Sequence, residues 1–136
     1  MKKYFLLLLF LSFGFIGISQ EKDCKFNYST SIEFGKPEQP WEAFAILSYD
    51  FSNLNLKSEN IKIEVVGILD CWNNLEGSDL RDLVVILDSK NENFNDRGTI
   101  NIMHESLMAK CFKYRVVIKN KICEEVSDWK FVTYNF

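Results

Sequence analysis

The chain has 136 residues, with 16 basic and 19 acidic side chains, a formal net charge of −3 and one histidine. This acidic balance argues against general nucleic-acid binding, because proteins hold the phosphate backbone through clusters of lysine and arginine. The length suits one domain that can bury a core of its own.

The first segment is expected to be a secretory signal peptide. Lys2 and Lys3 form a positive n-region, and the nearly unbroken apolar run Tyr4–Ile18 that follows ends in small residues that suit signal peptidase. The run is shorter than the ~20 residues that a membrane-spanning helix needs. We therefore predict a signal peptide over residues 1–19 and a single exported domain over residues 20–136, with no membrane span after cleavage.

All the cysteines follow the predicted cleavage point. They are Cys24, Cys71, Cys111 and Cys123. An even number of cysteines in an exported chain predicts two disulfides, which could be connected in three ways. A zinc site is the alternative, but the chain has no Cys-x-x-Cys pair and its one histidine is isolated. We expect disulfides, no metal, and a location in the periplasm, outside the cell or at the cell surface.

Seven short segments carry the alternating or β-branched pattern of strands. They are Lys25–Phe34, Glu42–Phe51, Ile61–Cys71, Leu83–Leu87, Thr99–Glu105, Phe112–Lys119 and Trp129–Tyr134. The polar segments between them, including 35–40, 72–79, 88–98 and 120–128, are predicted to be loops or turns.

Residues 79–87 fit two structures. Leu83–Leu87 is short and rich in valine and isoleucine, which is typical of a buried strand. The apolar residues of the segment also recur at helical spacing, with Ser78 as the N-cap. We favour the strand because the apolar run is short.

Short strands without a long helix predict an all-β fold, a seven-stranded antiparallel β-sandwich. The run Tyr114–Asn120, followed by a polar turn with Ser127 and Trp129, resembles the F–G hairpin of fibronectin type III domains. Met108, six residues before Tyr114, lies where that family places the leucine of its tyrosine corner. The resemblance covers roughly the last 30 residues, and the remainder agrees only in strand count. An immunoglobulin-like sandwich of another branch stays an alternative.

Such a sandwich also implies how the cysteines pair. Its first strand starts, and its sixth ends, at one pole, whereas its third ends and its sixth begins at the other. The expected pairs are therefore Cys24–Cys123 and Cys71–Cys111. A Cys111–Cys123 pair is disfavoured, because ~12 extended residues span far more than the ~6 Å that a disulfide allows between Cα atoms.

Catalytic chemistry has little support in the sequence. His104 is the only imidazole, and its neighbours Glu105 and Ser106 do not form a triad merely by being adjacent. Oxygen-bearing side chains alternate along Asp88–Asp96 as in calcium loops, but the glycine and the terminal glutamate of such loops are missing. We predict no catalytic residue, no cofactor and no enzyme, and we interpret this loop as solvated.

Positive charge gathers near the C-terminus. The residues are Lys110, Lys113, Arg115, Lys119, Lys121 and Lys130. Alternation places Lys113, Arg115 and Lys119 on one outward face, which could bind an acidic protein or a glycan. The alternative is a solvated sheet face balanced by nearby acidic residues, and we favour this alternative.

Some aromatic residues fall outside the inward pattern, and exposed aromatics often anchor interfaces. Trp72 is expected to pack on its neighbouring disulfide. The candidate partner-binding residues are Lys113, Arg115, Lys119, Trp41, Tyr134 and Phe136. The sequence thus predicts an exported, non-enzymatic binding or assembly module of the bacterial envelope that recognises a protein or glycan. The alternative is a small secreted inhibitor or ligand-binding protein that uses loops at one pole.

Overall fold

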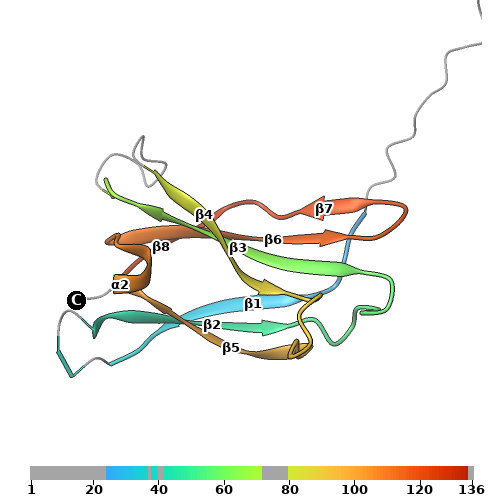
Figure 1. Cartoon of the computed structure of the whole chain (residues 1–136), viewed down its shortest axis with the longest axis horizontal. Helices are drawn as coiled ribbons and strands as arrows, with labels where there is room; N and C mark the ends of the chain where they lie inside the picture. Colours follow the sequence, from blue (N-terminus) through green and yellow to red (C-terminus); the bar gives the residue numbers. More distant parts are fainter. Residues whose placement is uncertain (1–23, 37, 40–41, 72–79, 135–136) are drawn as a thin grey trace, which may run out of the picture.

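The computed structural model describes residues 24–36, 38–39, 42–71 and 80–134 (Figure 1). The predicted signal peptide and three of the aromatic residues discussed above, Trp41, Trp72 and Phe136, lie outside the described residues. The described chain forms eight strands and one short helix. Their bounds are β1 Ser29–Phe34, β2 Phe44–Asp50, β3 Asn60–Ile68, β4 Leu80–Asp88, β5 Arg97–Met103, α2 His104–Leu107, β6 Cys111–Lys119, β7 Glu124–Val126 and β8 Lys130–Thr133.

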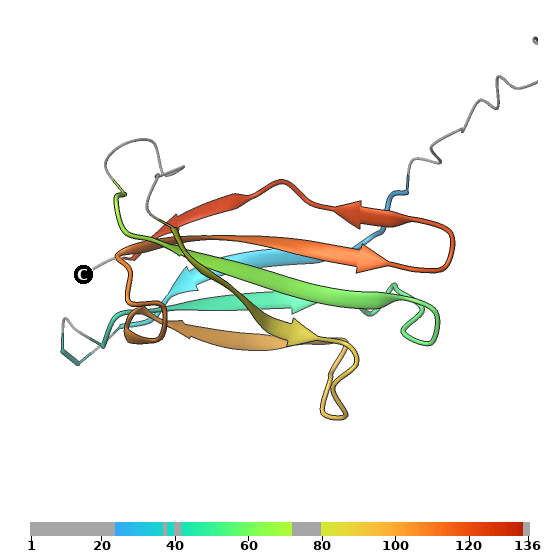
Figure 2. The same ribbon diagram turned by 45° about the horizontal axis from the view of Figure 1, so that its top comes forward.

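The strands form two antiparallel sheets that lie face to face (Figures 1 and 2). One sheet has three strands in the order β1-β2-β5. The other has five strands, in the order β4-β3-β6-β7, with β8 also paired to β6. Every strand pair is antiparallel, as predicted.

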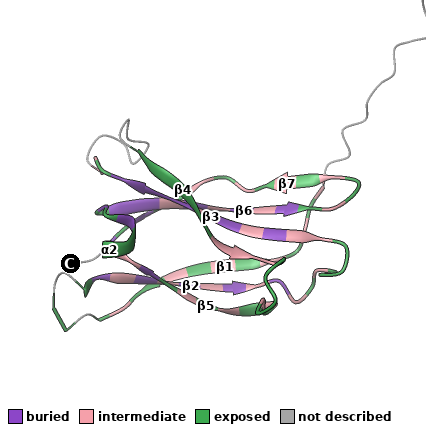
Figure 3. Cartoon of the chain, in the orientation of Figure 1, coloured by how far each residue is buried: buried purple, intermediate pink, exposed green. Residues whose placement is uncertain are grey.

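The core lies between the sheets, and its residues come from the alternating positions of both (Figure 3). Leu47 of β2 is fully buried, as are Ile61, Ile63 and Val65 of β3 and Phe112 of β6. A branched or aromatic side chain that leaves water in this way contributes about 1.5–3 kcal/mol. The two-residue period of the sequence therefore predicts which side of each central strand forms the core.

Two disulfides join segments that lie at the ends of strands. Cys24–Cys123 joins the segment before β1 to the turn between β6 and β7. Cys71–Cys111 joins the residues after β3 to the start of β6. Two disulfides were predicted, and they connect the pairs that the sandwich topology implies. Both therefore attach to β6 or to the turn that follows it.

The predicted count of seven strands is one too low, because β7 lies inside the segment 120–128 that was predicted to be a loop. Its residues pair with Val117–Lys119 of β6. Ser127 continues this pairing: the amide of Val116 donates to the hydroxyl of Ser127 at 2.9 Å, and the amide of Ser127 donates to the carbonyl of Val116 at 2.9 Å. Backbone pairing thus stabilises a polar segment that has no strand pattern of its own.

Two other predictions near these strands can be compared with the structure. Residues 80–88 form a strand, so the β-branched content decided correctly between strand and helix. The segment predicted as a strand to Glu105 ends at Met103 and continues as α2. The buried residue of this short helix is Leu107, which is 7% exposed. Met108, which the sequence placed at the leucine position of the tyrosine corner, is 67% exposed and has a left-handed backbone conformation with φ of 49°.

Candidate functional site

The outward side of the five-stranded sheet gathers most of the candidate residues, and we call it the outer face. Its residues follow from the register of the two central strands, in which Ile63 of β3 lies opposite Val116 of β6 and both are buried in the core. Successive side chains of a strand point to opposite sides of the sheet. The outer face is therefore formed by the alternate positions: Lys62, Glu64 and Val66 of β3, and Lys113, Arg115 and Val117 of β6.

Trp129 lies at the centre of the cationic part of the outer face. The Lys113 Nζ lies 4.9 Å from the centroid of its ring, and the Arg115 Cζ lies 4.4 Å from it. Each such cation–π contact contributes about 0.5–1 kcal/mol at an exposed site. Phe131 follows on the same side, directly opposite Lys113, and is 37% exposed. The face thus combines arginine, lysine, tryptophan and phenylalanine within one small area.

Carboxylates neutralise most of the positive charge on this face. The Arg115 Nε lies 2.7 Å from Glu64 Oε2, and the Lys119 Nζ lies 2.9 Å from Glu124 Oε2. Among the described residues, Lys113 has no ion pair with a carboxylate. The outer face is therefore amphipathic and close to neutral, which agrees with the favoured interpretation of a balanced sheet face.

One row of directly paired residues crosses the sheet from edge to edge on this side. It runs Leu83, Val66, Lys113 and Phe131, on β4, β3, β6 and β8. Leu83 is 46% exposed at one edge, and Phe131 is partly exposed at the other. Apolar side chains therefore lie on both sides of Lys113.

Comparison with family models, with curated proteins and with solved structures finds no match. None of the helices in the described ranges is long and apolar enough to cross a bilayer.

The structure brings together three of the predicted contact residues, Lys113, Arg115 and Lys119. It separates Lys130 from them, because the Lys130 Nζ donates to Thr30 Oγ1 at 2.8 Å and lies 5.6 Å from the Tyr114 ring centroid. The basic stripe of the sequence is therefore divided between two sides of the sheet.

Tyr134 was predicted to contact a partner, and this prediction is wrong. The side chain is 4% exposed, and its hydroxyl donates to the carbonyl of Ile102 at 3.2 Å. Its ring packs on Phe112 and, edge to face, on His104. Burial raises the pKa of the Tyr134 phenol well above its ordinary value. Tyr134 is thus a core residue that connects the end of β8 to the other sheet.

The sequence interpretation missed Trp129 and Phe131 as parts of the same face as Lys113. The signal that could have found them is the register of the last strand. Val132 lies opposite the buried Phe112, so Phe131 must point outward. The alternating pattern of Trp129–Tyr134 is compatible with either side facing the core, because aromatic residues occur on both.

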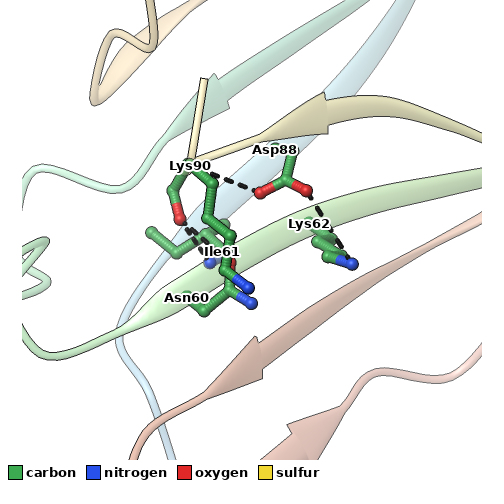
Figure 4. A network of polar contacts seen from close by, with 6 residues as sticks. Asn60, Ile61, Lys62, Asp88 and Lys90 are labelled. Atoms are coloured by element: carbon green, nitrogen blue, oxygen red, sulfur yellow. Dashed lines mark hydrogen bonds and ion pairs between the residues drawn. The ribbon is translucent and has the colours of Figure 1, made fainter. Parts of the chain in front are cut away.

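The two other sites considered from the sequence are His104 and the segment Asp88–Asp96. His104 lines a pocket of about 390 Å³ with Leu69, Cys71, Met108, Ala109 and Lys110, and no acidic side chain lies among these residues. In the segment proposed as a calcium loop, Asp88 accepts a bond from the amide of Lys90 at 3.0 Å and faces Lys62 at 3.8 Å (Figure 4). Within the described ranges, no group of three or more histidine, cysteine or acidic residues is arranged to hold a metal ion.

Proposed function

We propose that the protein is an exported binding module without enzymatic activity, which recognises a protein partner through the outer face. Arginine, tryptophan and tyrosine are the residues that most often dominate binding energy at interfaces, particularly at the centre of a patch. The cluster of Trp129 with Lys113 and Arg115, beside the exposed Phe131, carries this proposal.

A protein partner is favoured over a glycan by the same contacts. A sugar that stacks on tryptophan uses the face of the ring, and two cationic side chains, Lys113 and Arg115, already occupy part of the Trp129 ring surface. An acidic glycan needs uncompensated positive charge, whereas Arg115 and Lys119 are paired with carboxylates. An amphipathic, nearly neutral surface suits another protein.

The fold within this proposal is a fibronectin type III-like sandwich. The fourth strand pairs with the third, in the sheet that also contains the sixth and the last strands. In constant-type immunoglobulin domains the fourth strand joins the sheet of the first, second and fifth strands. The observed order therefore favours the fibronectin-like alternative over the constant-type immunoglobulin one.

The disulfides and the predicted signal peptide support export to an oxidising compartment, and we propose the periplasm or the surface of a bacterial cell. The partner then belongs to the same envelope.

Site-specific photo-cross-linking in intact cells tests the proposal. A photoreactive residue at position 131 should capture one envelope protein, whereas the same residue at Ser31, exposed on the other sheet, should not. The captured protein, once purified, should bind the variant with Lys113→Glu and Phe131→Ser at least about tenfold more weakly than wild type, a loss of ~1.4 kcal/mol. Glu33→Lys on β1 is the matched control and should bind normally. Equal capture from positions 31 and 131, or unchanged affinity of the double variant, would remove the outer face from the proposal.

A further inference from the structure

Two cations of β6 converge on the ring of Trp129. The Arg115 Cζ lies 4.4 Å from the ring centroid, and the Lys113 Nζ lies 4.9 Å from it. Both side chains point outward, because Tyr114 between them belongs to the core and successive side chains of a strand alternate between its two sides. An ammonium and a guanidinium are thus held against one aromatic ring on the outer face.

Arg115 keeps hydrogen-bonding capacity for a ligand. Its Nε donates to Glu64 Oε2 at 2.7 Å. Within the described ranges, neither terminal nitrogen of this guanidinium donates a hydrogen bond. Carboxylates bind guanidinium groups through such donors, and the charge of both partners strengthens the bonds. Glu64 therefore fixes the position of Arg115 and leaves its terminal nitrogens available.

Lys113 supplies a charge that the outer face does not balance by itself. Each carboxylate that the described register places on this face already faces a cation: Glu64 with Arg115, Asp88 with Lys62, and Glu124 with Lys119. Among the described residues, none of the ion pairs includes Lys113. The face therefore has one positive charge in excess.

Exposed apolar side chains border the two cations on both sides. Phe131 of β8 lies directly opposite Lys113 and is 37% exposed. On the other side, Leu83 of β4 lies opposite Val66 of β3 and is 46% exposed. The strands β8 and β4 are separated by three strand spacings, which is about 14 Å at ~4.8 Å between neighbours. The excess charge thus lies between two apolar borders.

We propose that the outer face binds a carboxylate of the partner protein, from an aspartate or glutamate that has an apolar residue on either side of it. This inference rests on the proposed binding function and names the chemistry that the face recognises. The carboxylate accepts hydrogen bonds from the Lys113 ammonium and from the terminal nitrogens of Arg115. The apolar side chains pack on Phe131 and on Leu83.

Charge distinguishes a different protein from a second copy of this chain as the occupant. If two outer faces met about a two-fold axis, each would bring one excess cation to the interface, whereas the described carboxylates of both faces already have cations. Two such faces do not complement each other. A single excess charge also suits one carboxylate better than a polyanion, whose further charges would meet Glu64.

An extended peptide provides a probe of this geometry. Residues i and i+4 of an extended segment are about 13 Å apart and lie on the same side as residue i+2. Two leucines with a glutamate between them therefore match the span from Phe131 to Leu83. The probe is the acetylated, amidated peptide with the sequence GLTETLG. Its controls are GLTQTLG, which replaces only the carboxylate, and GSTETSG, which replaces only the apolar side chains.

Nuclear magnetic resonance on the full-length secreted protein measures binding through the indole N–H of Trp129, which the variant Trp129→Phe assigns. GLTETLG should shift this signal and the backbone amides of Lys113 and Phe131. Both control peptides should bind at least about fivefold more weakly. Equal affinities for GLTETLG and GLTQTLG would overturn the inference, and so would the absence of any shift of the indole signal at millimolar GLTETLG.

A matched pair of lysine variants locates the carboxylate. Lys113→Met removes the ammonium and keeps an apolar side chain, so it should weaken the binding of GLTETLG at least about fivefold and leave that of GLTQTLG unchanged. Lys130→Met removes the lysine that lies 5.6 Å from the Tyr114 ring centroid, away from the outer face, and should leave both unchanged. Equal binding of GLTETLG by Lys113→Met and wild type would contradict the proposed contact.

The two proposals fail separately, because the peptide measurements do not require the partner. Absence of specific capture from position 131 would contradict the proposed function alone. A captured partner that binds Phe131→Ser more weakly than wild type, and Lys113→Met equally well, would support the proposed function and overturn this inference.

Discussion

Replacing Tyr134 with phenylalanine isolates one contact that connects the last strand to the opposite sheet. The variant keeps the ring that packs against Phe112 and His104, and it removes only the hydroxyl that donates to Ile102 at 3.2 Å. Loss of a buried donor in this way destabilises a protein by about 1–3 kcal/mol. We expect Tyr134→Phe to lower the free energy of unfolding at pH 7 by this amount.

The difference between the two proteins should depend on pH. Burial raises the pKa of Tyr134 in the folded state, whereas the unfolded phenol ionises near its ordinary pKa of ~10. A raised folded pKa gives stability that is fully present below the unfolded pKa and is lost as the pH rises above it. At pH 10.5 the wild type should have lost about 0.8 kcal/mol through this phenol, because the unfolded state releases its proton and the folded state does not. The variant has no such group.

Urea unfolding at pH 7 and pH 10.5, followed by circular dichroism with the disulfides intact, measures both effects. The advantage of the wild type over the variant should shrink by about 0.8 kcal/mol between the two pH values, with an unchanged dependence on urea. Tyr28 and Tyr49, whose pKa values are also raised by burial, contribute equally to both proteins. A stability difference that is the same at both pH values would refute the assignment of Tyr134 to a buried, neutral position.

Three further outcomes follow from the fold. The Cys24→Ala and Cys123→Ala double variant should unfold with a free energy lower by up to about 4.7 kcal/mol in urea, because the bridge closes a loop with a separation of 99 residues. Ile63→Ala, at a fully buried site, should lose about 2–5 kcal/mol in the same assay, and a loss under 1 kcal/mol would contradict its place in the core. Ser52→Ala should raise the carboxyl pKa of Asp50 in an NMR titration, because the hydroxyl and amide of Ser52 donate to that carboxylate at 2.6 and 2.9 Å and lower its pKa. The stability that these bonds give the folded protein is present above the ordinary carboxyl pKa and is lost as the pH falls through the lowered pKa.

The strands of the core could be predicted because their side chains carry the information locally. Alternation in β2 and β6 identifies both the strand and its buried side. In β4 the β-branched run outweighed the helical spacing, and the structure has a strand there. The cysteine pairs followed from topology, because each lies near the end of a predicted strand.

The elements that could not be predicted depend on contacts distant in sequence. The three residues of β7, two of them glutamates, form a strand only because β6 offers them backbone partners. The side of β8 that faces the core is decided by its register on β6, and a shift of one residue would have exposed Tyr134 and buried Phe131. The outer face was therefore predicted only in part. Alternation along β6 was enough to find its cations, whereas its aromatic residues could be found only from the register of β8 on β6.

The Cys24–Cys123 bridge has a mechanical consequence for a protein that is held at its two ends. Tension applied before Cys24 passes through the bridge directly to Cys123 and does not reach the chain between them. All of β1 to β6 lies within that shielded interval, so only β7 and β8 remain in the force path. Stretching should therefore extend the molecule by little more than the segment 124–134, peeled from β6, while the rest of both sheets stays folded. Reduction of this bridge alone would add β1, β2, β3 and β6 to the force path, whereas β4, β5 and α2 would stay shielded by the Cys71–Cys111 bridge.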